Sequence, residues 1–147
     1  MTEMLHRLVY YSRNRIVGSA EQTSAAIAQI LSASRRNNPR VGVTGALMFS
    51  TGYFAQVLEG PHDAIEDRFE RIQQDERHND VLLLCFEASA TRRFENWSMA
   101  YIDRTQGPDA ARDASAARRF EPGRMTSDQL LKELHELVLD EERALLP

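Results

Sequence analysis

The chain has 147 residues, of which 42% are hydrophobic and 27% are charged. This length and composition are those of one globular domain with its own core, and they exclude collagen-like, low-complexity and wholly disordered chains. The formal net charge is −4, from 18 basic and 22 acidic residues. Charge therefore gives no basis for binding nucleic acid or an anionic membrane.

Cys85 is the one cysteine in the chain, and the four histidines are scattered. A single cysteine forms no internal disulfide, and this pattern lacks the spacing of a zinc site, so we expect no metal. The N-terminal residues lack the apolar stretch of a signal peptide, and the longest apolar run, Val81–Phe86, is too short to cross a bilayer. The sequence therefore predicts a cytoplasmic, soluble protein with no membrane association.

The predicted elements follow from strand-forming residues, helical periodicity, capping residues and breakers. In chain order they are a strand at 5–12, a helix at 19–36, a hairpin with arms at 43–49 and 53–58, a helix at 61–75, and strands at 81–86 and 94–102. The first helix begins at a capping box opened by Ser19, and it ends before Pro39. Pro61 is expected in the first turn of the second helix. Val81–Phe86 is apolar throughout, which is typical of a central strand covered on both sides.

The order βαββαβ plus one further strand predicts an α+β protein with a ferredoxin-like fold. In this fold a mixed sheet carries two helices on one face. The first strand is central and lies beside the second arm of the hairpin. Because side chains alternate along a strand, Tyr10 and Ser12 share one face of the first strand, and we expect Tyr10 to lie near Gln56.

The composition changes after Arg104, which predicts a domain at 1–104 and a C-terminal helical extension at 105–147. The extension contains a possible short helix at 109–119. Thr126–Gln129 forms a second capping box before an amphipathic, leucine-rich helix. Such a helix either covers the bare face of the sheet or contacts another chain. We favour the first use.

Each polar residue on the predicted inner face has an ordinary structural interpretation when it is taken alone. Tyr10 fits a core aromatic with a satisfied hydroxyl, and Asn38 fits a turn at the end of a helix. Arg71 fits an ion pair with Asp67 one helical turn away. Gln56 fits a bridge between two backbone groups at an irregularity in the sheet, since a buried amide needs defined hydrogen-bond partners. We favour the ordinary interpretation for each residue taken singly.

Several segments, taken together and in order, resemble the BLUF domain, a blue-light sensor that uses flavin. The resemblance covers roughly residues 5–103. It rests on Leu8-Val9-Tyr10-Tyr11-Ser12, Arg36-Asn37-Asn38-Pro39, Val43-Thr44-Gly45-Ala46-Leu47, Phe54-Ala55-Gln56-Val57-Leu58-Glu59-Gly60, Asp75-Glu76-Arg77-His78 and Arg93-Phe94-Glu95-Asn96-Trp97-Ser98-Met99.

The resemblance implies a role for each matching residue. Tyr10 is the photoactive tyrosine, Gln56 is the switch amide between Tyr10 and the flavin, and Ser12 supports their network. Trp97 and Met99 are the residues of the last strand that exchange places near Gln56. The residues implied to bind the cofactor are Asn37, Asn38, Gln56, Arg71, Ile30, Ser34, Ile72 and His78. The implied cofactor is FAD, with FMN or riboflavin as alternatives.

The implied function is that of a photoreceptor and not of an enzyme. Tyr10 gives an electron and a proton to the excited flavin, and Gln56 then rotates or tautomerises, which exchanges the donor and the acceptor that its amide presents. The signal passes through the last strand to the C-terminal helices. Its target is a downstream protein that the sequence does not identify, and a homo-oligomer is expected.

Two other functions fit a ferredoxin-like fold. One is an acylphosphatase-like hydrolase using Arg40 and Asn38, although no glycine-rich phosphate loop lies beside them. The other is a flavin-free interaction module built around the C-terminal helix. Fold analogy alone supports either one only weakly.

Overall fold

The computed structural model of the chain describes residues 5–14, 20–50, 53–75, 78–94, 97, 99–103 and 126–144. Its elements are β1 (Leu5–Asn14), α1 (Ala20–Asn37), the short 3-10 helix η1 (Asn38–Val41), β2 (Thr44–Ser50), β3 (Tyr53–Pro61), α2 (His62–Gln74), β4 (His78–Ala88), β5 (Ala100–Asp103) and α5 (Ser127–Ala144). The predicted capping residue Ser19 and the predicted helix at 109–119 lie outside the described residues.

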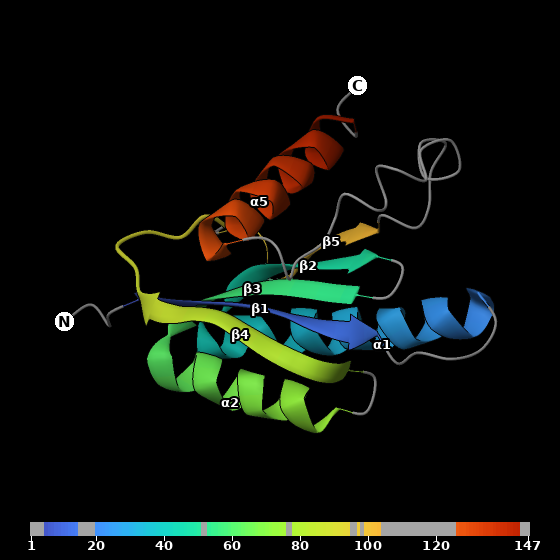
Figure 1. Cartoon of the computed structure of the whole chain (residues 1–147), viewed down its shortest axis with the longest axis horizontal. Helices are drawn as coiled ribbons and strands as arrows, with labels where there is room; N and C mark the ends of the chain where they lie inside the picture. The colour runs from blue at the N-terminus through green and yellow to red at the C-terminus, as the bar shows by residue number, and fades with distance from the viewer. Residues whose placement is uncertain are drawn as a thin grey trace.

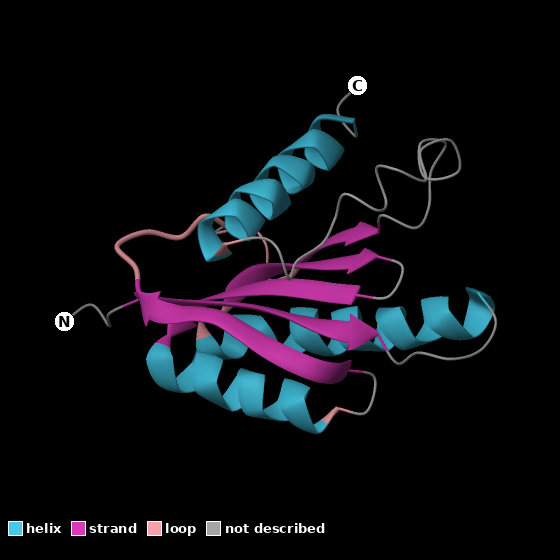
Figure 2. Ribbon diagram, in the orientation of Figure 1, coloured by secondary structure: helices cyan, strands magenta, loops and turns pink. Residues whose placement is uncertain are grey.

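The strands form one five-stranded sheet in the order β4-β1-β3-β2-β5. Neighbouring strands are antiparallel except β2 and β5, which are parallel. Helices α1 and α2 cover one face of the sheet, and α5 lies against the other (Figures 1 and 2). The ferredoxin-like α+β fold predicted from the sequence is therefore confirmed.

Alternation along the strands divides the core between the two faces of the sheet. On the α1 and α2 side, the buried residues are Leu8, Tyr10, Ile27, Leu31, Val43, Leu47, Phe49, Phe54, Leu58, Ile65 and Met99. On the other side, which we call the α5 cluster, they are Val9, Ala46, Met48, Ala55, Val57, Phe94, Ala100, Ile102, Leu130, Leu131, Leu134 and Val138. Each buried aliphatic side chain of this kind contributes roughly 1.5–3 kcal/mol.

The start of α5 is fixed by reciprocal hydrogen bonds of the predicted capping box. The Gln129 N–H donates to Thr126 Oγ1 at 3.1 Å, and the Thr126 N–H donates to Gln129 Oε1 at 2.9 Å. The apolar stripe of the helix then faces the sheet, where Leu130 and Leu134 are fully buried. The C-terminal helix therefore covers the sheet face that α1 and α2 leave bare.

No described helix combines the length and apolar character that a membrane crossing needs.

The predicted position of Val81–Phe86 in the sheet is wrong. This run belongs to β4, which lies at the edge of the sheet beside β1. Leu82 is 51% exposed and Leu83 is 48% exposed. An apolar run indicates that a strand is hydrophobic, but it does not indicate how many other strands pair with it. The run therefore could not distinguish an edge strand from a central one.

The last strand is shorter than predicted. Regular pairing begins at Ala100, and Phe94, Trp97 and Met99 lie in no strand; the Trp97 N–H donates to the Phe94 carbonyl at 3.1 Å. Strand alternation therefore does not apply to these three residues. Trp97 consequently packs with the α5 cluster and Met99 packs on the opposite face, whereas the predicted strand at 94–102 would have placed both on one face, so that prediction is wrong.

The second helix also starts later than predicted. Pro61 is the last residue of β3 and precedes the helix as its N-cap, with φ −62° and ψ 142°. A proline fits this position because its fixed φ suits an extended residue as well as a first helical turn.

We predict that Leu134→Ala lowers the free energy of unfolding by about 2–5 kcal/mol, because it removes a fully buried side chain between α5 and the sheet. Urea denaturation measures this change. Lys132→Ala on the exposed side of the same helix is the control and should change stability by less than about 0.5 kcal/mol. Equal effects of the two substitutions would contradict the packing of α5 on the sheet.

Candidate functional site

A buried hydrogen bond between Tyr10 and Gln56 lies at the centre of the sheet. The register of β1 and β3 places the two residues directly opposite each other, and both side chains face α1 and α2. Tyr10 is 0% exposed and Gln56 is 4% exposed. The Tyr10 hydroxyl donates to Gln56 Oε1. The amide that the sequence placed on a buried face therefore has a defined partner.

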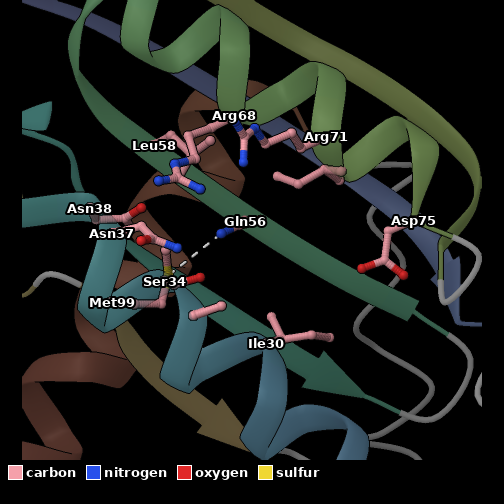
Figure 3. Close-up of a pocket in the computed structure, with 12 residues that line it drawn as sticks. Ile30, Ser34, Asn37, Asn38, Gln56, Leu58, Arg68, Arg71, Asp75 and Met99 are labelled. Atoms are coloured by element: carbon pink, nitrogen blue, oxygen red, sulfur yellow. Dashed lines mark hydrogen bonds between the residues drawn. The ribbon is translucent and has the colours of Figure 1, made fainter. Parts of the chain in front are cut away.

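The other end of the same amide contacts Met99. Gln56 Nε2 donates to Met99 Sδ at 3.5 Å (Figure 3). A thioether sulfur is a weak acceptor and never a donor, so this contact requires the nitrogen of the amide on the Met99 side. The Met99 carbonyl in turn accepts from Arg35 Nε on α1 at 3.1 Å. Gln56 thus connects β1, through Tyr10, to the segment that precedes β5.

Gln56 forms part of the wall of a cavity between α1 and α2 (Figure 3). The cavity has a volume of about 240 Å³. Its lining residues are Ile30, Ala33, Ser34, Asn37, Asn38, Gln56, Leu58, Arg68, Arg71, Ile72, Asp75 and Met99. The lining combines apolar side chains with several convergent polar and charged groups, which suits a small organic ligand or cofactor that is itself partly polar.

The end of α1 brings the two asparagines to this cavity. The α-helix stops at Asn37, and η1 follows from Asn38 to a left-handed residue at Gly42, whose φ is 72°. A φ of this sign strongly favours glycine, so the sequence Asn-Pro-Arg-Val-Gly turns the chain sharply here. The turn buries Asn38, which is 1% exposed, at the cavity wall.

Arg68 and Arg71 on α2 make one side of the cavity positive. Arg68 Nε is buried, and it has no hydrogen-bond partner within the described part of the chain. Burial lowers the pKa of Arg68, and the nearby charge of Arg71 lowers it further. A buried donor left unpaired costs about 1–3 kcal/mol, so this group fits a ligand that brings an acceptor. Arg71 is more exposed and pairs with Asp67 at 3.2 Å, as its sequence spacing indicated.

The environment of Tyr10 keeps its hydroxyl protonated. Burial raises the pKa of Tyr10 far above its ordinary value, and the negative charge of Asp75 raises it further. The phenol therefore remains a hydrogen-bond donor to Gln56 over the whole neutral range. Asp75 also lines the cavity, so the same carboxylate affects both the Tyr10 hydroxyl and the cavity.

The structure brings most of the predicted site residues together. Those that line the cavity are Ile30, Ser34, Asn37, Asn38, Gln56, Arg71, Ile72 and Met99. Tyr10 contacts Gln56, and Ser12 is buried further along β1 on the side that its spacing predicts. Trp97 does not join them, because it packs on the other face of the sheet. His78 begins β4, and its side chain lies outside the described residues.

Two charged residues that line the cavity, Arg68 and Asp75, were not predicted from the sequence as site residues. They stand three residues before and four residues after Arg71, which is the spacing of one helical face. That spacing was the signal that could have identified them.

The residues of the hydrolase alternative are not brought together. Asn38 is buried at the cavity, whereas Arg40 is exposed. Among the described residues, no group of three or more histidine, cysteine or acidic side chains is placed to hold a metal ion.

A family model described as BLUF, sensors of blue-light using FAD, matches residues 5–100. The blue light- and temperature-regulated antirepressor BluF of Escherichia coli strain K12 is 32% identical over 100 residues, which is 68% of this chain. The chain spans only 24% of the length of that relative.

Solved structures of BLUF proteins have the same fold. BlrB, solved in its dark state, is 31% identical with a TM-score of 0.75, and the match covers 96% of this chain and 99% of BlrB. BlsA in its photo-activated state is 29% identical with a TM-score of 0.76, and the match covers 92% of this chain and 96% of BlsA.

We predict that Tyr10→Phe changes how stability depends on pH in alkaline solution. Above about pH 10 an unfolded tyrosine loses its proton, whereas buried Tyr10 keeps it, so the free energy of unfolding falls as pH rises. This residue contributes a decline of about 1.4 kcal/mol per pH unit. The variant lacks the ionisable group, so denaturation above pH 10 should show a flatter decline than in the wild type. Identical slopes would contradict the buried, protonated state of Tyr10.

Proposed function

The chain belongs to the BLUF family, sensors of blue light that use FAD, and on that premise we propose that Gln56 is its light-driven switch. The observation that carries this proposal is the buried hydrogen bond from Tyr10 to Gln56 at the wall of the cavity. A blue-light sensor of this kind binds a flavin and is not itself an enzyme. The hydrolase and the flavin-free module are not favoured.

The cavity residues fit a flavin. Ile30 and Ile72 offer apolar contact to a flat ring, and Asn38 offers an amide that both donates and accepts. The unpaired Arg68 Nε would meet a carbonyl or phosphate oxygen of the cofactor. We propose that Asn37, Ser34, Arg71 and Asp75 complete the site. FAD is the flavin named for the family, and FMN and riboflavin are the alternatives to test.

A bound flavin that has absorbed blue light is a strong oxidant. Tyr10 would supply it with one electron and the hydroxyl proton, and would regain both when the dark state returns, so nothing is consumed. Gln56 lies in contact with Tyr10 and also lines the cavity, which makes its amide the natural relay for the proton. Transient oxidation of Tyr10 would free Oε1 of Gln56 from its donor.

Two rearrangements of Gln56 have different consequences for Met99. Rotation of the amide turns Oε1 toward Met99 Sδ, and neither atom is a donor, so the present 3.5 Å hydrogen bond is lost. Tautomerisation leaves an N–H on the Met99 side, so the contact survives. The state of the Met99 contact therefore separates the two rearrangements.

We propose that the output leaves through Met99, β5 and α5. Met99 immediately precedes β5, and the residues of β5 and α5 pack together in the α5 cluster. The target would be a separate downstream protein or another copy of this chain in a homo-oligomer, in the cytoplasm, where a free Cys85 stays reduced. The name antirepressor in the Escherichia coli relative supports action on a protein partner. In this scheme residues 1–104 sense light and residues 105–147 pass the signal on.

We predict that Tyr10→Phe and Gln56→Leu abolish the light-induced spectral change while the protein still binds flavin. Each substitution removes one end of the buried hydrogen bond and leaves the cavity walls in place. Dark and illuminated absorption spectra of the purified variants measure the effect. Tyr11→Phe removes a neighbouring hydroxyl on the opposite face of β1 and should respond as the wild type does. A normal light response in Tyr10→Phe would contradict the proposal.

We predict that Arg68→Met weakens flavin binding by about tenfold or more, because it removes a charged donor that the cofactor would satisfy. Titration of the cofactor-free protein with FAD, FMN and riboflavin measures this. Weaker binding of all three flavins would show that Arg68 contacts the ring. Weaker binding of FAD and FMN alone would show that Arg68 contacts the phosphate that riboflavin lacks. Unchanged affinity for all three would exclude Arg68 from the site.

A further inference from the structure

A buried carboxylate on β3 holds the segment that leads to Trp97 and Met99. Glu59 is 1% exposed and faces away from the cavity. Its Oε2 accepts from Arg7 Nε at 2.9 Å and lies 2.8 Å from Arg7 Nη2. Its Oε1 accepts from the backbone N–H of Phe94 at 2.8 Å and of Arg93 at 2.9 Å. The carboxylate thus joins β1, β3 and the turn after β4.

These contacts make the burial of a charge tolerable. A buried carboxylate is strongly unfavourable unless it is paired and hydrogen-bonded, and Glu59 has both a guanidinium and backbone amides. Arg7 Nη2 also donates to the Thr91 carbonyl at 3.1 Å. Arg92 Nη1 donates to the Glu59 carbonyl at 3.2 Å and to Thr44 Oγ1 at 3.0 Å. The turn is therefore fixed by charge-assisted hydrogen bonds and not by strand pairing.

The segment that begins at this anchor carries the residues nearest the switch. Phe94 is fully buried in the α5 cluster, with its ring 6.2 Å from Trp97 and 5.6 Å from His135 on α5. Further along, the Trp97 carbonyl accepts from the Gly45 N–H at 3.1 Å. A Cβ atom at Gly45 would lie 2.0 Å from the Val57 carbonyl oxygen, so the close approach of β2 to β3 at this position requires glycine.

The far end of the segment is held from the cavity side. There the Met99 carbonyl accepts from Arg35 Nε. Phe94, Trp97 and Met99, the described residues of this stretch, lie in no strand, so strand alternation does not decide which side chain enters the cavity. With Arg93 and Phe94 held by Glu59, Trp97 lies against α5 and Met99 reaches Gln56.

We propose that Glu59 is a positioning residue of the light switch, acting through the backbone of Arg93 and Phe94 to keep Met99 against Gln56 and Trp97 on the α5 side. The inference rests on the proposed function in one respect, namely that Gln56 is the switch. The placement of Trp97 and Met99 by Glu59 is independent of light.

Glu59→Gln tests this proposal with a side chain of the same shape. A carboxylate accepts on both oxygens, whereas an amide offers one acceptor and one donor group. The donor group must then face either Arg7 or the backbone N–H groups, and one set of contacts is lost. Trp97 is the one tryptophan in the chain, so its fluorescence reports on the segment without a label.

We expect Glu59→Gln to retain its far-ultraviolet circular dichroism and its flavin, while Trp97 becomes more accessible to acrylamide in the dark. The rate at which the lit spectrum returns to the dark spectrum should change by about tenfold, the effect of one charged hydrogen bond. Glu70→Gln makes the same charge change on the exposed side of α2 and should match the wild type in both measurements. Ile65→Val destabilises the core on the cavity side and should leave Trp97 quenching unchanged.

Wild-type quenching and wild-type recovery in Glu59→Gln would overturn the proposal. If that variant fails to fold, Glu59→Asp decides, because it keeps the charge but shortens the side chain, so the carboxylate no longer reaches both Arg7 and the N–H groups of Arg93 and Phe94. A shift of Trp97 quenching supports the proposal, and unchanged quenching overturns it. If the wild-type protein shows no spectral change in light, the proposed function fails, while the dark quenching of Trp97 still tests the role of Glu59.

Discussion

The hydrogen bond between the Tyr10 hydroxyl and the Gln56 amide is the interaction on which the proposed light response depends. Both groups are buried in the middle of a sheet, where neither is stable without a partner. Because the amide also donates to Met99, its two ends belong to different parts of the chain. Any rearrangement of the amide therefore changes a contact to β1 and a contact to the segment before β5. In this way a local change in hydrogen bonding at the cavity can alter the contacts of elements outside it.

In the proposed mechanism the two faces of the sheet have different roles, one in sensing light and the other in output. Along β3, Gln56 and Leu58 face the cavity, whereas Val57 and Glu59 face the side covered by α5. Phe94 and Trp97 pack with α5, whereas Met99 reaches Gln56, so neighbouring residues of the chain contact both faces.

The sequence predicted those features that regular periodicity controls. The ferredoxin-like order of elements, the meeting of Tyr10 and Gln56 and the capping box at Thr126 follow from alternation, topology and local hydrogen bonding. Periodicity was misleading at Trp97 and Met99, because alternation applies only within a strand and both residues lie outside the strands. Arg68 and Glu59 were not identified because a charged residue in a sequence gives no sign of burial. Only the fold shows that one lines a cavity and the other is enclosed.

The most direct test of the account is the visible absorption spectrum of the purified, flavin-loaded protein in the dark and under blue light. Rearrangement of Gln56 alters the hydrogen bonds offered to the flavin without changing its covalent structure. We therefore expect a small shift of the flavin bands to the red that reverses in the dark. A bound flavin whose spectrum does not move under blue light would contradict the switch formed by Tyr10 and Gln56.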